Sequence, residues 1–277
     1  VESKSGHHFI GNFHASGTEI INTLGGEHLE TGSLILYTSG DSVFQIAAHE
    51  DVLNLEGLYK VSEIAREVCN KFNIGRVIAR PFKGELGSFI RTYDRKDFGI
   101  SPPGETILSH LKANGYRNFG VGKISDLFGE EFLDDSIHTE GDLDGLTRLE
   151  SLIQESQHDL YFINLVDLDM VYGHREDPIG YYEGLKIIDK GLNNILLNLD
   201  KDDLLIITGD HGTDPTDGKT DHSREYVPLV AFKNGIKGNY VGDRNSFADI
   251  ASTICDYFEI PDIFKDGTSF FNDIKNK

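Results

Sequence analysis

The most constraining feature of this sequence is the alternation of short apolar runs with segments of helical periodicity. The runs at 33–39 and 75–82 are rich in branched and aromatic residues, which is typical of buried strands. Between them, apolar residues recur every three or four positions, as on one face of a helix: Leu55, Leu58, Val61, Ala65, Val68 and Phe72. Strands that alternate with helices predict an α/β fold.

A break in this pattern divides the chain. The segment GISPPGE (99–105) contains two prolines and two glycines, which are typical of a boundary. Beyond it we expect helices at 105–116 and 246–258, strands at 118–124, 159–167, 202–210 and 226–232, and a polar acidic loop after the first of these strands. A long helix is indicated by the stripe Leu185, Ile188, Leu192, Ile195 and Leu199. We therefore predict two domains, residues 1–101 and residues 102–277.

Composition narrows the possible functions. The formal net charge is −20, so a nucleic acid would be repelled. Cys69 and Cys255 are the only cysteines, too few for a disulfide framework or a cysteine-type zinc site. The sequence contains neither a bilayer-length apolar run nor a recognisable signal peptide. We expect no nucleic-acid partner, no membrane partner and a cytoplasmic location.

An aspartate and a histidine follow the apolar run in LLIITGDHGTDP (204–215). Asp210 and His211 stand at the C-terminal end of the predicted strand, where open α/β sheets bind their ligands. A carboxylate oxygen and an imidazole nitrogen suit manganese or zinc. Taken alone, the pair also fits a polar turn in which Asp210 caps the following segment.

A second strand end carries the same chemistry. The run FINLV is followed by Asp167, Asp169 and His174, and His222 lies further along the chain. In a parallel sheet the ends of these strands meet at one edge. Carboxylates crowded at that edge would repel one another without a neutralising cation, so we expect a metal site there.

The ordered segments of the chain resemble the phosphopentomutases, which belong to the alkaline phosphatase superfamily. The resemblance covers essentially the whole sequence and rests on IGNFHASGTEI, ETGSLILYTSGDSVFQIAAHE, GRVIARPF, GKISD, NLVDLD, GHREDP, TGDHG and TDHSREYVPL. It implies that residues 102–277 form part of an alkaline phosphatase-like core, with a mostly parallel sheet and helices on both faces. Residues 1–101 would form an α/β cap domain.

The resemblance implies a pair of Mn²⁺ ions. Asp169, His174 and His222 would bind one ion, and Asp210 and His211 would bind the other. Asp167 is a nearby carboxylate that the spacing does not favour. The ions would stabilise charge on the attacking and leaving oxygens of the transferred phosphoryl group.

The resemblance also implies the substrates. Members of the family interconvert (deoxy)ribose 1-phosphate and (deoxy)ribose 5-phosphate with a sugar bisphosphate activator, in nucleoside catabolism. Ser39 and Asp41 would contact the ribose, while Arg76 and Lys123 would hold its distal phosphate. Arg91 would assist, although a solvated surface charge is an equal alternative for this residue.

The sequence departs from the family pattern in three places. Gly209 and Thr213 stand where the family motif has Ala and Asn. The family relays the phosphoryl group through a threonine, and no threonine here has the corresponding context. We expect this nucleophile, with one further carboxylate ligand, upstream of Val1, and we expect the 277-residue chain alone to be catalytically impaired.

Two alternative functions stay open. One is another superfamily mutase or phosphatase, such as a cofactor-independent phosphoglycerate mutase. The other is a non-catalytic fragment with a partial metal site.

Overall fold

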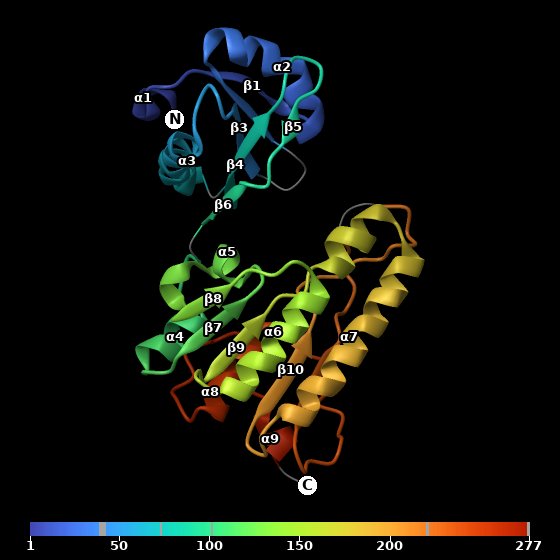
Figure 1. The fold of residues 1–277 in the computed structure, drawn as a ribbon. Helices are drawn as coiled ribbons and strands as arrows, with labels where there is room; N and C mark the ends of the chain where they lie inside the picture. Colours follow the sequence, from blue (N-terminus) through green and yellow to red (C-terminus); the bar gives the residue numbers. More distant parts are fainter. Residues whose placement is uncertain (39–42, 73, 101, 220–221, 276–277) are drawn as a thin grey trace. The chain divides into compact units, whose positions relative to one another are not determined.

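The computed structural model describes the chain except residues 39–42, 73, 101, 220–221 and 276–277. Two compact units are present (Figure 1). One comprises Val1–Pro102 and Asp126–Gly129, and the other comprises Pro103–Ser125 and Glu130–Lys277. The first unit therefore ends one residue beyond the predicted boundary and also includes a short segment that lies within the predicted second domain. Its role as a cap stays a prediction.

The first unit contains a mixed β-sheet. Its strands are β1 (Phe9–His14), β2 (Leu34–Thr38), β3 (Val43–His49), β4 (Arg76–Lys83), β5 (Ile90–Arg91) and β6 (Lys96–Gly99). The order is β1-β2-β3-β4-β5, and β6 also pairs with β4. β1–β2 and β3–β4 are parallel pairs, whereas the other pairs are antiparallel. The helices are α1 (Glu2–Ser5), α2 (Gly17–Thr31), α3 (Leu55–Cys69) and the short 3₁₀ helix η1 (Asn70–Phe72).

Different helices cover the two faces of this sheet. Successive strand residues point to opposite faces, so the neighbours Leu34 and Ile35 enter different cores. Leu34 packs with Leu58 of α3, and Ile35 packs with Ile20 of α2. Leu58, Val61 and Ala65 of the predicted stripe thus lie on the buried face of α3. Phe72, the last residue of the stripe, lies in η1 and is 70% exposed.

The second unit contains two sheets. Its strands are β7 (Asn118–Val121), β8 (Asp135–Ile137), β9 (Leu160–Ile163), β10 (Leu204–Thr208) and β11 (Leu229–Lys233). β7 pairs in parallel with both β8 and β9, while β10 and β11 form an antiparallel pair. Its helical segments are α4 (Ile107–Ala113), α5 (Ile124–Phe128, which spans both units), η2 (Glu130–Phe132), α6 (Asp142–Glu155), η3 (Leu168–Tyr172), η4 (Gly173–Arg175), α7 (Pro178–Asn198), α8 (Ala248–Tyr257) and α9 (Phe271–Lys275).

Two details of the predicted second half are wrong. The segment expected to be a polar acidic loop holds α5, η2, β8 and α6. The acidic residues of this segment are compatible with a helix, because Asp142 and Asp144 lie in the first turn of α6, where the helix dipole stabilises negative charge. Leu146 and Leu149 form the buried face of this helix. The strand expected at 118–124 ends at Val121, since Gly122 turns the backbone with φ +80°.

Helices cover both faces of the strands in the second unit. α6 and α7 pack over β9 and β10, around Leu146, Ile195 and Leu205. α8 and α9 pack on the opposite face of β10, where Leu204 and Ile206 point. Within the predicted α7 stripe Ile195 is fully buried and Ile188 and Leu192 are partly buried, whereas Leu185 near the start of the helix is 46% exposed. No helix in the described ranges has the length and apolar content needed to cross a bilayer.

Candidate metal centre

Side chains able to bind a metal meet where β9 and β10 end. β9 leads into the turns η3 and η4, which carry Asp169 and His174. β10 leads into the loop that carries Asp210 and His211. His222 comes from the far side of the same loop, next to the bridge that pairs Gly212 with Ser223.

Asp169 lies at the centre of the cluster. One of its oxygens, Oδ2, lies 3.3 Å from His174 Nε2, and the other, Oδ1, lies 3.3 Å from His222 Nε2. The two imidazole rings are stacked with centroids 5.0 Å apart. The ligand atoms of the three residues all lie within 4.8 Å of one another. One carboxylate and two imidazoles form a donor set that fits Mn²⁺ or Zn²⁺, and the residues are those predicted for the first ion.

The residues predicted for the second ion adjoin this cluster. The ring of His211 stacks on the ring of His222, with centroids 3.6 Å apart. His211 Nε2 lies 3.6 Å from Asp210 Oδ2, and the Asp210 side chain is 69% exposed. Within the described part of the chain the ligand group of three comprises Asp169, His174 and His222, so the second site stays a prediction.

Thr213 links the two halves, a contact that the sequence did not reveal. Its hydroxyl lies 3.4 Å from Asp169 Oδ1 and 3.3 Å from His211 Nδ1. A side chain at Gly173 would collide with the Thr213 methyl group, so the close packing of the two loops requires glycine there. The only signal was the position of Thr213, directly after the Asp-His-Gly triplet.

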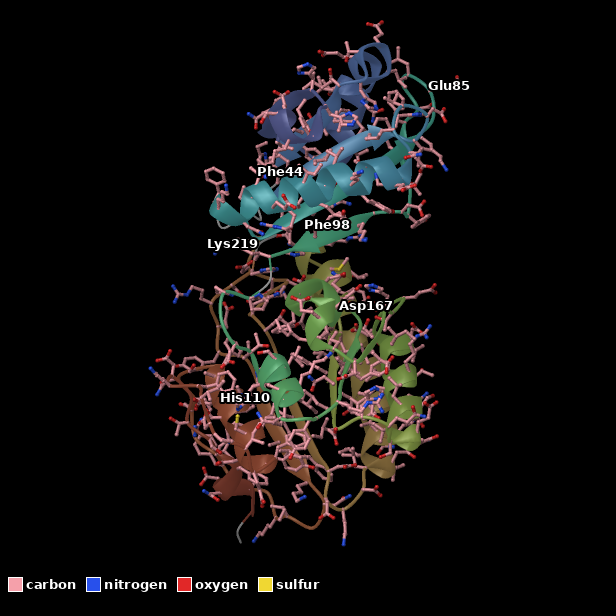
Figure 2. All side chains as sticks on the ribbon, turned by 90° about the vertical axis from the view of Figure 1, so that its left-hand side faces the viewer. Phe44, Glu85, Phe98, His110, Asp167 and Lys219 are labelled. Atoms are coloured by element: carbon pink, nitrogen blue, oxygen red, sulfur yellow. The ribbon has the colours of Figure 1, made fainter. Side chains whose placement is uncertain are left out.

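Asp167 lies outside the cluster. Its Oδ2 accepts a hydrogen bond of 2.8 Å from the backbone amide of Asp142, at the first turn of α6. Asp167 is labelled in Figure 2. The carboxylate that the spacing did not favour as a ligand is thus bound to a helix terminus.

The predicted substrate residues are distributed over the chain. Lys123 follows β7, and its ammonium group contacts the sulfur of Met170, the residue after Asp169. Arg76 lies in the first unit, where its Nη1 is 3.8 Å from Asp97 Oδ2. Arg91 is exposed and lies beside Gly17. Ser39 and Asp41 fall outside the described residues, and all five assignments stay predictions.

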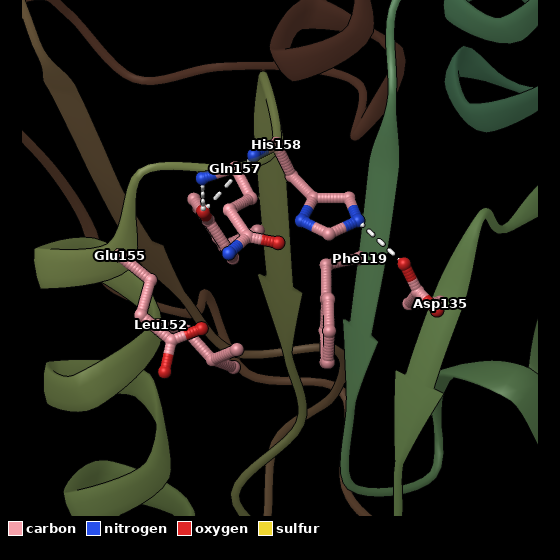
Figure 3. Close-up of a pocket in the computed structure, with 7 residues that line it drawn as sticks. Phe119, Asp135, Leu152, Glu155, Gln157 and His158 are labelled. Carbon is pink, nitrogen blue, oxygen red and sulfur yellow. Dashed lines mark hydrogen bonds and ion pairs between the residues drawn. The ribbon is translucent and has the colours of Figure 1, made fainter.

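A cavity of about 240 Å³ lies at the other end of the parallel strands (Figure 3). It is lined by Phe119, Asp135, Leu152, Glu155, Gln157, His158 and Tyr161. His158 Nε2 lies 2.9 Å from Asp135 Oδ2, and its ring packs edge-on against Phe119. Asp135 begins β8, so this cavity is separated by the length of the strands from the edge that carries Asp169.

Comparison with known proteins identifies the family. Residues 135–262 match the model of the Metalloenzyme superfamily. The chain is 49% identical to a phosphopentomutase from Caldanaerobacter subterraneus subsp. tengcongensis over 100% of this chain and 70% of that protein. It is also 49% identical to a phosphopentomutase from Thermotoga maritima, over 98% of this chain and 70% of the relative. The chain belongs to the phosphopentomutase family. This confirms the resemblance seen in the sequence, and the α/β fold agrees with the expected class.

The match to the phosphopentomutases covers nearly every residue of this chain. A third phosphopentomutase, from Anaeromyxobacter sp., is 49% identical over 96% of this chain and 68% of its own length. Phosphopentomutases are isomerases that move a phosphoryl group. Among solved structures, a phosphoglycerate mutase from Leishmania mexicana matches 58% of this chain and 38% of its own, with 16% identity and a TM-score of 0.47. That likeness is too weak to support a conclusion about function.

Proposed function

We propose that the protein interconverts (deoxy)ribose 1-phosphate and (deoxy)ribose 5-phosphate, with two Mn²⁺ ions and a sugar bisphosphate activator. The observation that carries this proposal is the cluster of Asp169, His174 and His222 at the strand ends of a phosphopentomutase-family chain. The metal and the activator come from the family resemblance, supported by a donor set that suits Mn²⁺. The two free, buried cysteines suit a reducing compartment such as the cytoplasm.

The metal-binding roles are divided between two groups of residues. Asp169, His174 and His222 hold one ion, and Asp210 and His211 hold the other. Bound metal supplies electrostatic stabilisation of the phosphoryl oxygens. Thr213 keeps the two ligand loops together through Asp169 and His211.

Substrate binding falls to side chains outside the metal cluster. The contact of Lys123 with Met170, the residue after Asp169, supports a role for its ammonium group in attracting a sugar phosphate towards the metals. Arg76 supplies a guanidinium for the distal phosphate, and Arg91 supports it. Ser39 and Asp41 bind the ribose hydroxyls.

The proposal is tested by following the conversion of ribose 1-phosphate into ribose 5-phosphate by the purified protein. Because no threonine of this chain has the context of the family's relay, we expect turnover well below that of an ordinary enzyme. We expect this turnover to require Mn²⁺, to be abolished by a chelator and to fall by at least about a further hundredfold in His222→Ala. His8→Ala, which removes an exposed histidine of the first unit, is the matched control.

Other outcomes would assign the protein differently. Turnover of phosphoglycerates, or hydrolysis of simple phosphomonoesters, in place of pentose phosphate conversion would identify another enzyme of the superfamily. Stoichiometric metal binding without turnover of any of these substrates would identify a non-catalytic module.

A further inference from the structure

Two aspartates bind each other's backbone at the start of α6. Asp142 is 3% exposed, and its Oδ1 accepts hydrogen bonds from the amides of Val166 (2.7 Å) and Asp167 (3.0 Å). In return, Asp167 Oδ2 accepts a hydrogen bond of 2.8 Å from the amide of Asp142. The N-terminus of α6 and the loop after β9 are therefore joined in both directions.

Asp167 also packs closely against the backbone at the start of α6. Gly141, which precedes α6, has φ +119°, and a Cβ atom there would lie 2.8 Å from Asp167 Oδ2. Only glycine combines that backbone conformation with so close an approach of the carboxylate. Asp167 in turn places negative charge at a helix N-terminus, where the helix dipole stabilises it.

Burial of the Asp142 carboxylate costs free energy, which suggests that the buried group has a specific role. Burial raises the pKa of this carboxyl, as does the neighbouring Asp167, while the two amide hydrogen bonds oppose the rise. Its second oxygen, Oδ2, has no hydrogen-bond partner among the described residues. A helix start needs no buried carboxylate, since a partly exposed cap serves equally well. What Asp142 does beyond starting α6 is to hold two amides of the neighbouring loop.

The loop that Asp142 holds is the one that carries Asp169. The carbonyl of Val166 accepts a hydrogen bond of 2.9 Å from the amide of Met170, so the turn containing Asp169 begins at Val166. Asp169 must present its two oxygens to two imidazoles, 3.3 Å from each. Sites of this kind tolerate displacements of only about 0.5 Å.

We propose that Asp142 is a positioning residue for the metal centre, because it fixes the loop backbone from which Asp169 reaches the two histidines. The inference rests on the proposed role of Asp169 as a metal ligand. Asp142 does not touch the cluster itself; it acts through the amides of Val166 and Asp167. Groups that orient metal ligands commonly change metal affinity by about 10- to 100-fold when removed.

The test is a titration of the protein with Mn²⁺, in which free Mn²⁺ is followed by electron paramagnetic resonance. Asp142→Ala should weaken binding by about 10- to 100-fold. Asp142→Asn keeps the Oδ1 acceptor and should restore affinity to within about threefold of the wild type. Asp144→Ala is the matched control, since Asp144 lies two residues away and pairs with Arg148 and the amide of Glu140, not with the loop. It should bind Mn²⁺ as the wild type does.

A purely structural role makes a different prediction. If Asp142 only stabilises the fold, Asp142→Ala should unfold at a lower urea concentration, and the Mn²⁺ affinity of the folded variant should equal that of the wild type. Wild-type affinity in folded Asp142→Ala, or equal losses in the Ala and Asn variants, would overturn the proposal. If Asp142→Ala does not fold, Asp142→Leu keeps the approximate size and shape of the side chain but removes the same two acceptor bonds to the amides of Val166 and Asp167. Unchanged affinity in that variant would also overturn it.

The readout separates this inference from the proposed function. Mn²⁺ affinity does not depend on which phosphate ester is the substrate. A wild-type protein that binds Mn²⁺ but leaves pentose phosphates unchanged would refute the proposed function, while the comparison of Asp142 variants would still decide the positioning role.

Discussion

Asp169 contacts both histidines of the candidate metal centre: its Oδ2 lies near His174 and its Oδ1 lies near His222. Its charge extends to α7, where burial first, and then the carboxylates of Asp169 and Asp214, raise the pKa of Tyr181. At the scale of single residues, the site holds one carboxylate between two imidazoles, an arrangement that a divalent cation stabilises.

Lys123→Ala and Arg76→Ala should weaken substrate binding more than metal binding. Each removes a cation assigned to the distal phosphate, so we expect KM for ribose 5-phosphate to rise by about 10-fold or more. Mn²⁺ affinity should stay near that of the wild type. Steady-state kinetics beside an Mn²⁺ titration measure both effects. Arg117→Ala, which removes a cation from the opposite end of β7, is the control, and kinetics that do not change in either test variant would refute the phosphate role.

Cys255 should be unreactive in the folded protein. Burial, followed by Asp262 and Asp256, raises the pKa of its thiol from 9.0 to about 11. A rise of that size lowers the reactive thiolate fraction about a hundredfold near pH 8, before access is considered. Alkylation followed by mass spectrometry should show slow modification in buffer and rapid modification in urea. Fast labelling of Cys255 in the native protein would contradict the buried environment.

Single hydrogen bonds also join whole elements. In the first unit, buried His28 of α2 donates from Nδ1 to the carbonyl of Ser33 (2.7 Å) and accepts at Nε2 from the amide of His49 on β3 (2.8 Å). The bond from His49 requires a neutral ring, because Nε2 can accept only when it carries no proton, whereas Nδ1 can donate to Ser33 in either protonation state. Burial lowers the pKa of His28 below 6.5, although the bond to Ser33 opposes this.

The link between α2 and β3 should therefore weaken in mild acid. The unfolded chain protonates His28 near pH 6.5 and the folded chain does so only at lower pH, so stability is fully present above 6.5 and falls as the pH drops below it. One such group contributes at most about 1.4 kcal/mol per pH unit. Urea unfolding between about pH 7.5 and 5.5 should show a steeper loss for the wild type than for His28→Gln, which cannot titrate. Parallel pH profiles would exclude His28 as the cause.

At the scale of the whole molecule, each unit has its own hydrophobic core. Leu34, Ile46 and Leu58 belong to a core of the first unit, whereas Leu146 and Ile195 belong to one of the second. Each core is closed by helices that its own unit supplies.

Loss of packing should consequently stay within a unit. Ile46→Ala and Ile195→Ala are the same substitution at two residues with no exposed surface, and each should cost about 2–5 kcal/mol. Hydrogen exchange followed by mass spectrometry should show faster exchange in the first unit for Ile46→Ala and in the second for Ile195→Ala. Equal acceleration in both units by either variant would show that the units unfold together.

The sequence by itself determined the α/β class, because the periodicity of strands and helices is a local pattern. The family, and the grouping of Asp169, His174 and His222 as candidate ligands, followed from the resemblance of whole segments to the phosphopentomutases. Only the tertiary structure decided which side chains meet. It placed His222 beside Asp169 across more than fifty residues, brought Thr213 between the two ligand loops and bound Asp167 to the start of α6. It also revealed α6 inside an apparent acidic loop. These features depend on contacts between segments distant in the chain, and hydrogen bonds across such distances leave no periodic signal in the sequence.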